Sequence, residues 1–254
     1  MNEKKEYDNA TDFQRKLYNT DIKKDTYRIF LIRKIIEKLI TKDPKTNNKI
    51  LDVGCGDGEL LYPFINKSDT YGFDIADKLI NKAKKKGIKA SVLNLESSKF
   101  PFSDEFFDII ICSQVIEHIV NTDHLLSEIN RVVKKNETLI ISFPNINQPA
   151  SFLIQLIYDL PPVFAARYKS PHVRDFTLKT IKIALKNNGF IVKNVIPTYI
   201  FPFNNRISSL FAKIFIRFSH RIILVCQKIR KVKKKYQTIP IMGEDKFEPH
   251  QIKI

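Results

Sequence analysis

The chain has 254 residues, a formal net charge of +16 and 43% hydrophobic residues, so it is long enough for one sizeable core. Its charged first segment, MNEKKEYDNATDF, argues against a secretory signal, and no stretch reaches the ~18 uninterrupted apolar residues of a membrane span. Three widely separated cysteines, Cys55, Cys112 and Cys226, argue against a disulfide framework and predict a reducing cytoplasm.

The positive charge is concentrated toward the C-terminus. Residues 151–254 carry 19 basic and 5 acidic side chains, whereas residues 51–150 carry 11 basic and 14 acidic ones. An anionic partner is therefore expected to bind the C-terminal part of the chain.

Residues 26–40, TYRIFLIRKIIEKLI, form the first clear pattern. Ile29, Ile32, Ile36 and Leu39 recur at helical spacing with basic residues between them. This periodicity predicts an amphipathic helix.

The stretch ILDVGCGDGEL, residues 50–60, contains three of the chain's seven glycines. A buried strand before it and apolar helical spacing after it place these glycines at a strand–turn–helix junction, where backbone N–H groups can approach a ligand. Asp52, Asp57 and Glu59 would repel a phosphate there and favour a ligand that carries an ammonium and a sulfonium. The next predicted strand ends at Asp74, whose carboxylate can accept hydrogen bonds from two ribose hydroxyls.

Strand and helix patterns alternate up to residue 145. Strands are predicted at 50–53, 70–74, 89–93, 107–112 and 137–143, and helices at 58–66, 77–86 and 121–134. Helical stretches between strands indicate a parallel sheet with helices on both faces.

The pattern changes after residue 145. Residues 148–171, with an apolar run at 152–158, are expected to form an inserted lid. Thr177 then caps a predicted helix over 178–188 that ends at Gly189. Strands are expected over 190–196 and 221–227.

Residues 203–218, between the last two predicted strands, have an apolar helical face and interspersed basic residues. Together with the polybasic run 228–235, this pattern is typical of a membrane-surface element. A helix packed in the core and followed by a solvated basic tail is the alternative.

Five blocks in order resemble the class I S-adenosylmethionine-dependent methyltransferases, in particular the small-molecule and quinone-type enzymes. The blocks are ILDVGCGDGEL, YGFDIAD, FPFSDEFFDIIICSQVIEHI, LLSEINRVVKKNETLIISFPN and HVRDFTLKTIKIALKNNGF. The resemblance implies an α/β fold with a Rossmann-like seven-stranded sheet, mostly parallel with an antiparallel last strand, and helices on both faces. It divides the chain into an N-terminal helical cap (1–48), the methyltransferase domain (49–228) and a basic tail (229–254) that we expect to be flexible. In this family the cap closes over the cofactor, so Tyr18 or Arg28 is a candidate contact, with simple packing on the sheet as the alternative.

The resemblance also implies that S-adenosyl-L-methionine binds to these residues: Asp52, Gly54, Cys55, Gly56, Asp74, Ile75, Asn94, Leu95, Ser113 and Gln114. Within this set, the backbone of 54–56 cradles the methionine portion, while Asp52 orients the loop or the amino group. Asp74 binds the ribose hydroxyls, and Ile75 packs on the adenine ring.

The other four residues of that set follow two later strands. Asn94 stands where many family members carry Asp, and its amide oxygen can accept the same bond from the adenine without the charge. Leu95 donates its N–H to the ring. Ser113 and Gln114 lie beneath the methionine chain.

Methyl transfer to a hydroxyl requires alignment of donor and acceptor and removal of a proton. His118 is a candidate general base because the reference pKa of histidine lies near neutrality, with a structural tie between loop and helix as the alternative. His172 is a second candidate, facing the substrate after the lid, where Arg174 is a candidate to hold an anionic group; a loop-fixing cluster is the alternative. No set of residues shows metal-ligand spacing, so no metal is expected.

The leading hypothesis is a methyltransferase that acts on an oxygen, with a carbon as the alternative, of a small or lipid-linked acceptor such as a sugar or quinone precursor. Residues 203–235 are expected to meet an anionic membrane surface, which places the chain in the cytoplasm and at the inner face of the membrane. One alternative is an RNA methyltransferase that uses the basic C-terminal third, although residues 112–115 lack the Asn/Asp-Pro-Pro-aromatic motif of amino-methyltransferases. A cofactor-binding protein without catalysis is the other alternative, and the sequence makes no prediction of the oligomeric state.

Overall fold

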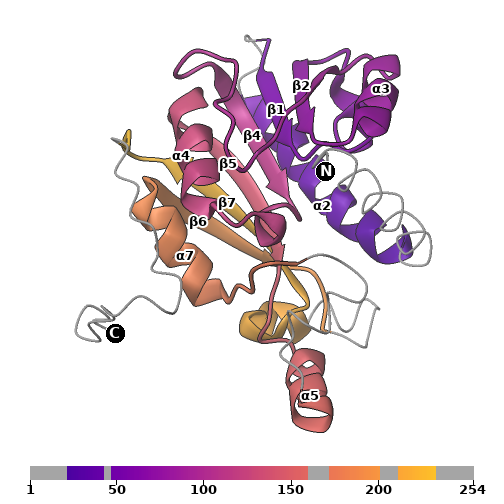
Figure 1. Ribbon diagram of the computed structural model, residues 1–254, viewed down its shortest axis with the longest axis vertical. Helices are drawn as coiled ribbons and strands as arrows, with labels where there is room; N and C mark the ends of the chain where they lie inside the picture. The colour runs from indigo at the N-terminus through magenta and orange to yellow at the C-terminus, as the bar shows by residue number, and fades with distance from the viewer. Residues whose placement is uncertain (1–21, 43–46, 160–171, 201–210, 233–254) are drawn as a thin grey trace, which may run out of the picture.

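A seven-stranded sheet organises the computed structural model, which describes residues 22–42, 47–159, 172–200 and 211–232 (Figure 1). The strands are β1 (Lys49–Val53), β2 (Asp69–Asp74), β3 (Lys89–Val92), β4 (Phe107–Ser113), β5 (Val133–Pro144), β6 (Phe190–Pro197) and β7 (Arg221–Lys228). The helices are α2 (Ile22–Lys42), α3 (Asp77–Lys85), α4 (Thr122–Val132), α5 (Pro149–Tyr158) and α7 (Leu178–Asn187). Short 3₁₀ helices are η1 (Tyr62–Phe64), η2 (Ile116–His118) and η3 (Ile216–Phe218).

The strands follow the order β3-β2-β1-β4-β5-β7-β6. Strands β1 to β5 pair in parallel, and β7 runs antiparallel to both β5 and β6. The predicted sheet, mostly parallel with an antiparallel last strand, is therefore confirmed. In a parallel sheet the carboxyl ends of the strands share one edge, and ligands bind at that edge.

Alternating side chains divide the interior into two apolar cores on opposite faces of the sheet. Along β4, Ile110 and Cys112 enter the core that also holds side chains of α4 and α7. Ile109 and Ile111 enter the core that also holds side chains of α2 and α3. This period of two fixes the strand register, since a slip of one residue would exchange the two faces.

The predicted helix over residues 58–66 does not form. Turns surround the short η1 in this segment, although Leu60, Leu61 and Phe64 are buried as the apolar pattern indicated. Gly58 has a φ of 78°, outside the helical region, and Pro63 cannot donate a backbone hydrogen bond. The glycine loop therefore leads into turns and not into the N-terminus of an α-helix.

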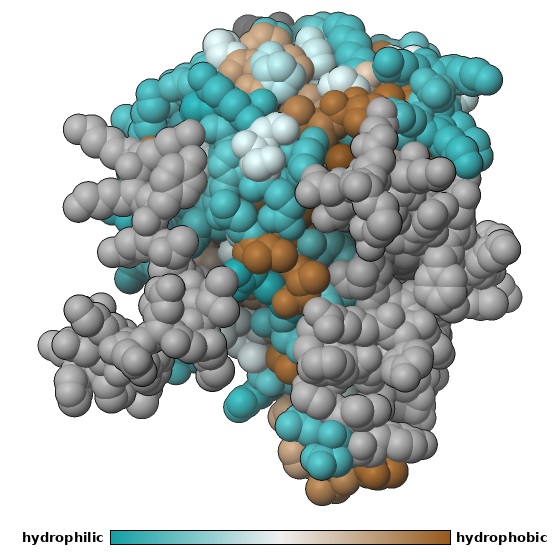
Figure 2. Space-filling view, viewed as in Figure 1, coloured by the Kyte–Doolittle hydropathy of each residue, from teal (hydrophilic) through white to brown (hydrophobic). Residues whose placement is uncertain are grey.

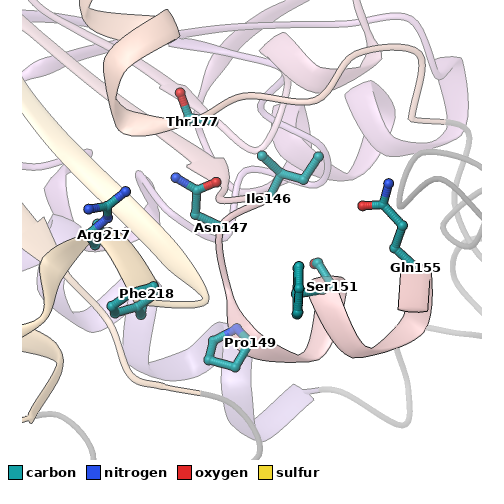
Figure 3. A pocket seen from close by; sticks show the side chains of 9 residues that line it. Ile146, Asn147, Pro149, Ser151, Gln155, Thr177, Arg217 and Phe218 are labelled. Atoms are coloured by element: carbon teal, nitrogen blue, oxygen red, sulfur yellow. The ribbon is translucent and has the colours of Figure 1, made fainter. Parts of the chain in front are cut away.

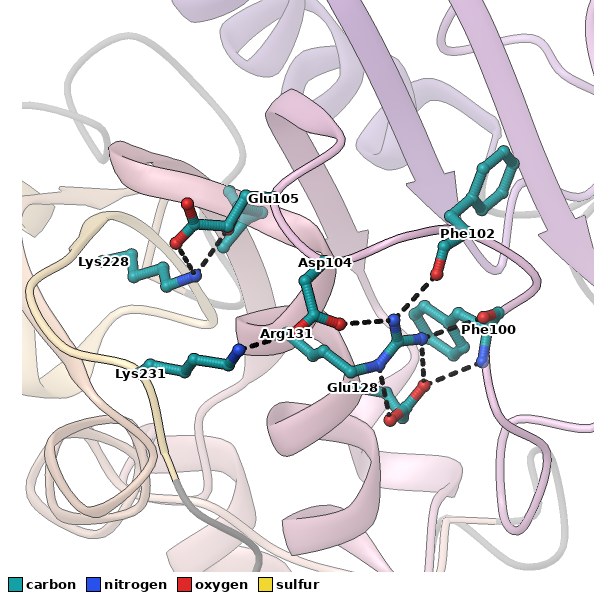
Figure 4. A network of polar contacts seen from close by, with 9 residues as sticks. Phe100, Phe102, Asp104, Glu105, Glu128, Arg131, Lys228 and Lys231 are labelled. Atoms are coloured by element: carbon teal, nitrogen blue, oxygen red, sulfur yellow. Dashed lines mark hydrogen bonds and ion pairs between the residues drawn. The ribbon is translucent and has the colours of Figure 1, made fainter.

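Arg131 of α4 holds the phenylalanine-rich turn before β4 (Figure 4). Its guanidinium donates to the carbonyl oxygens of Phe100 (2.9 Å) and Phe102 (2.7 Å) and to the carboxylates of Glu128 (2.7 Å) and Asp104 (3.1 Å). Glu128 in turn accepts from the Phe100 N–H at 2.8 Å. This buried network fixes the turn onto α4 and so sets where β4 enters the sheet.

The first part of the predicted basic tail, residues 229–232, is held against the protein by hydrogen bonds to α4 and to the turn after α7. Lys231 forms an ion pair with Asp104 at 2.6 Å. Lys228 is buried and pairs with Glu105 at 3.1 Å (Figure 4). These contacts place residues 229–232 against the protein, while the flexibility of the tail stays a prediction and residues 233–254 lie outside the described residues.

The predicted lid and amphipathic insertion are described in part. α5 forms the first half of the lid and projects away from the sheet (Figure 1), while residues 160–171 lie outside the described residues. Residues 211–214 are helical and lead into η3, while 203–210 lie outside the described residues. Within the described ranges, no helix combines the length and apolar character that a membrane crossing requires.

Candidate functional site

The glycine loop is fastened to the end of β2. The N–H groups of Gly54 and Cys55 both donate to the Phe73 carbonyl oxygen at 2.8 Å. The N–H of Gly56 donates to Oδ2 of Asp74 at 2.9 Å, and the N–H of Ala76 donates to Oδ1 of Asp74 at 3.0 Å. The loop and the tip of the second strand therefore form one hydrogen-bonded unit.

The environment of Asp74 fits its expected role. Burial raises the pKa of this carboxyl group, and its backbone hydrogen bonds oppose that shift. Each carboxylate oxygen uses one acceptor position on the backbone and keeps another for a ligand. Asp74 thus braces the loop, and its role as an acceptor for a ligand stays a prediction.

The glycines of the loop are required for different reasons. A Cβ on Gly54 would lie 2.3 Å from Cγ2 of Val115, in the segment that follows β4, and Gly54 has a φ of 78°. A Cβ on Gly56 would meet nothing within 4 Å, so this glycine borders open space. Gly54 allows two loops to pack together, whereas Gly56 leaves room where the expected cofactor would lie.

Cys55 contributes its backbone and not its thiol. A Cβ built on Gly72 of β2 would lie 2.6 Å from the Cys55 Sγ. The Cys55 side chain therefore packs against β2, beneath the loop. Burial raises the pKa of the Cys55 thiol far above its usual range. The interpretation of Cys55 as a small apolar filler agrees with this position.

The three acidic residues of the loop have different surroundings. Their number alone therefore does not decide which of them would meet a cationic ligand. Asp57 pairs with Lys86 at 2.9 Å, and Glu59 pairs with Arg33 at 2.9 Å. Asp52 is buried, and burial raises its pKa to about 7, with the positive charge of Arg28 opposing this shift. A cationic ligand group would therefore meet Asp52, because the two exposed acids are paired elsewhere.

Ser113 and Gln114 lie in a polar network at the end of β4. Ser113 Oγ is 2.8 Å from Oγ of Ser142 and accepts a hydrogen bond from Arg28. Gln114 has a φ of 57°, and its Oε1 accepts from Nε of Arg221 at 3.0 Å. Arg28 of α2 thus reaches the predicted site.

The predicted adenine-binding residues lie after β2 and β3. Oδ1 of Asn94 accepts from the Glu96 N–H at 2.9 Å, in a local turn. The Leu95 side chain is buried and Ile75 is partly buried. Their contacts with adenine stay predictions, and Asn94 would use the remaining acceptor position of its amide oxygen.

The two candidate catalytic histidines lie side by side. The rings of His118 and His172 have centroids 4.9 Å apart. Burial, His118 and Arg221 lower the pKa of His172 to about 4, so His172 is neutral at physiological pH. A neutral imidazole has a free nitrogen lone pair that can accept a proton or bind a metal.

Glu117 is a site residue that the sequence did not single out. It is 1% exposed, and burial raises its pKa to about 8 against the opposing effects of its own N–H and of Arg28 and Arg221. In η2 it lies between the buried Ile116 and the partly buried His118. An acidic residue within an apolar segment was the available signal.

A pocket of about 530 Å³ opens between α5 and η3 (Figure 3). Its lining residues are Ile146, Asn147, Pro149, Ser151, Phe152, Gln155, Thr177, Arg217 and Phe218. Ile146 and Asn147 follow the carboxyl end of β5, so the pocket lies along the edge of the sheet that carries the glycine loop. The lining combines apolar and polar side chains, half of them from α5, with one basic side chain, Arg217.

Comparisons with known proteins identify the family of the chain. A family model described as a methyltransferase domain matches residues 25–194. An uncharacterized protein of Methanocaldococcus jannaschii is 30% identical over 168 residues, which cover 65% of this chain and 69% of that protein. The ubiquinone biosynthesis O-methyltransferase of Rickettsia conorii is 32% identical over 114 residues, covering 41% of this chain and 38% of that enzyme.

Solved structures share the fold. The magnesium protoporphyrin IX methyltransferase of Synechocystis PCC 6803, solved with bound SAH, matches with a TM-score of 0.60 and 17% identity. The match covers 86% of this chain and 94% of the Synechocystis chain.

Proposed function

This chain belongs to the methyltransferase-domain family and is an S-adenosylmethionine-dependent methyltransferase, and we propose that it methylates an oxygen of a small or lipid-linked acceptor at a membrane surface. S-Adenosylmethionine supplies a methyl group on a sulfonium. Asp52, Gly56 and Asp74 fit this cofactor, because they offer a buried carboxylate, open space and a braced acceptor.

The observation that carries the proposal is an exposed apolar surface next to the pocket. On α5, the side chains of Phe152, Leu153, Leu156 and Ile157 are between 51% and 71% exposed. Figure 2 shows brown, hydrophobic side chains at the end of the molecule where Figure 1 places α5. Large apolar side chains gathered on one surface mark an interaction site more often than an ordinary surface.

A second exposed apolar group lies across the pocket from α5. Phe211, Ile214, Phe215 and Phe218 are exposed, and Lys213 and Arg217 are exposed among them. Apolar side chains with interspersed basic residues match the interface of an anionic bilayer, where each basic residue adds about 1 kcal/mol. We name the two groups together, residues 152–157 and 211–218, the apolar rim.

The pocket adjoins this apolar rim, and we propose it as the entry for the acceptor. Phe152 and Phe218 belong to the rim and also line the pocket. An acceptor with an apolar portion would enter from the bilayer along these side chains. Its polar portion would meet Asn147, Thr177 and Arg217 at the carboxyl edge of the sheet.

The choice of oxygen rests on two arguments. Transfer to a hydroxyl needs a proton acceptor, and His118 and His172 lie together beyond the carboxyl end of β4. In addition, the relative from Rickettsia conorii is by its name an O-methyltransferase. Because the chain matches 38% of that enzyme, its acceptor is not carried over.

The RNA alternative loses part of its motivation. It rested on the basic C-terminal third, yet Lys228 and Lys231 form ion pairs with Glu105 and Asp104. Incorporation of labelled methyl groups into total RNA would favour it. Cofactor binding without any turnover would favour the non-catalytic alternative.

Flotation with liposomes tests the membrane part of the proposal. The wild-type chain is expected to float with anionic vesicles, and the double variant Leu156→Asp/Ile157→Asp to partition at least about tenfold less. The matched control is Ile183→Asp, an exposed apolar position on α7 outside the rim, which should float like the wild type. Equal flotation of all three proteins would refute the role of the rim.

Labelled S-adenosylmethionine tests the acceptor class. Incubation with a membrane lipid extract is expected to yield a methylated lipid whose label resists mild alkali, as an ether does. A product labelled on nitrogen or carbon would refute O-methylation.

A further inference from the structure

Three potential metal ligands meet beyond the carboxyl end of β4. A carboxylate oxygen of Glu117 and one ring nitrogen each of His118 and His172 all lie within 4.8 Å of one another. Their separation in sequence concealed this cluster, because His172 follows His118 by more than fifty residues. The pattern of two histidines and one carboxylate is the ligand set that binds Fe(II) and related ions in other proteins.

The backbone holds the two segments of this cluster together. The carbonyl oxygen of Glu117 accepts from the N–H groups of Val173 (2.9 Å) and Arg174 (3.2 Å). The Arg174 guanidinium also donates to the carbonyl oxygen of Val120, with its Nε at 3.0 Å. His172 is therefore positioned beside His118 by the fold and needs no ligand to bring it there.

The Glu117 carboxylate points to a missing partner. The side chain is 1% exposed, and its Oε2 has no hydrogen-bond partner among the residues that the structure describes. A buried polar oxygen without a partner is costly, and a cation bound by it would remove that cost.

We infer that Glu117, His118 and His172 bind a divalent first-row transition-metal ion. Ligand atoms bound to one ion at about 2.0–2.2 Å lie about 3–3.5 Å apart, so the side chains would have to close by up to about 1–2 Å. The positive charges of Arg28 and Arg221 act on Glu117, and they would also repel a bound cation. This repulsion weakens most the binding of ions that are held by charge alone. The site therefore favours ions that bind imidazole strongly, such as Zn²⁺, Fe²⁺ or Co²⁺, over Mg²⁺ and Ca²⁺.

The proposed ion would lie next to the cofactor loop. Val115, two residues before Glu117, packs against Gly54 of that loop. If the proposed O-methylation holds, an acceptor hydroxyl on the ion would lose its proton to solvent water more readily, because a bound cation stabilises the oxyanion. His118 and His172 would then hold the ion in place of accepting the proton themselves. This role rests on the proposed function, whereas the binding of the ion does not.

The test measures binding of Co²⁺ to the full-length chain, which carries no affinity tag. Binding is monitored by the visible absorption of Co²⁺ and by titration calorimetry, in the absence of S-adenosylmethionine. We expect one Co²⁺ per chain, displaced by Zn²⁺ but not by Mg²⁺. His172→Ala and Glu117→Gln should each lower the affinity at least about 100-fold, since even changes behind the ligands cost 10–100-fold. His220→Gln is the matched control, because His220 lies outside the cluster and contacts Gln148.

Two results would overturn the inference. One is the absence of stoichiometric Co²⁺ and Zn²⁺ binding to the folded wild-type chain. The other is an equal affinity of wild type, His172→Ala and Glu117→Gln. Methyl transfer is measured separately, so stoichiometric metal binding without O-methylation would refute only the proposed function.

Discussion

Alanine substitutions at two glycines of one loop should affect different properties of the protein. Gly54→Ala places a methyl group 2.3 Å from Cγ2 of Val115 at a φ of 78°, whereas Gly56→Ala places it in open space at a φ of 53°. The first substitution is therefore expected to reduce the free energy of unfolding, and the second to reduce the affinity for S-adenosylmethionine.

The magnitudes follow from the two environments. A left-handed conformation costs a non-glycine residue about 1–2 kcal/mol at either position. Overpacking against Val115 adds about 1–3 kcal/mol at Gly54 alone, for a total of about 2–5 kcal/mol. At Gly56 the methyl group would occupy space that the cofactor needs, so we expect at least a tenfold weaker affinity.

Urea unfolding and calorimetric titration measure the two effects separately. The double variant Gly54→Ala/Val115→Ala should be less destabilised than the sum of the single variants by about 1–3 kcal/mol, because the contact is relieved. Equal unfolding midpoints for Gly54→Ala and Gly56→Ala would refute the packing argument. Unchanged cofactor affinity in Gly56→Ala would refute the placement of the ligand.

Three further predictions address other parts of the structure. The pKa of Asp52 is about 7 in the folded chain, so the folded chain keeps a proton that the unfolded chain releases near pH 4. The free energy of unfolding therefore falls as the pH rises between these two values, by up to about 1.4 kcal/mol per pH unit. Asp52→Asn should flatten this dependence in urea unfolding at pH 5 and pH 7, and an unchanged slope would contradict it. Arg131→Met leaves the buried carboxylate of Glu128 without its cation and should lower the free energy of unfolding by about 3–5 kcal/mol. Adding Glu128→Gln should recover part of this loss. An unchanged midpoint of thermal unfolding in Arg131→Met would count against the network. Thr177→Ala removes the cap of α7 and should cost about 1 kcal/mol, whereas Thr177→Ser should cost little, and equal losses would argue against the cap.

The sheet could be predicted because its signals are local and periodic. Apolar runs separated by helical stretches located the strands, and the cap residue Thr177 located the start of α7. The helix at 58–66 was wrong, because apolar spacing alone did not reveal the positive φ of Gly58. Burial followed from the pattern, but the backbone conformation did not.

The site was predicted where a motif is contiguous. Gly56, in the loop after β1, and Asp74, at the end of the neighbouring β2, lie together as expected. The pairing of Asp57 with Lys86 and the meeting of Glu117 with His172 depend on contacts between distant segments, which no periodicity encodes. Local patterns therefore predicted the meeting of Gly56 with Asp74 but not the meeting of Glu117 with His172.

The central claim is that Asp74 and the glycine loop bind S-adenosylmethionine. Calorimetric titration of the wild type is expected to show micromolar binding, weakened by about 10²–10⁴-fold in Asp74→Ala, since two hydrogen bonds to a charged group are lost. Asp69→Ala, at the other end of β2, is the matched control and should bind like the wild type. No binding to the wild type, or equal binding to Asp74→Ala, would contradict the claim.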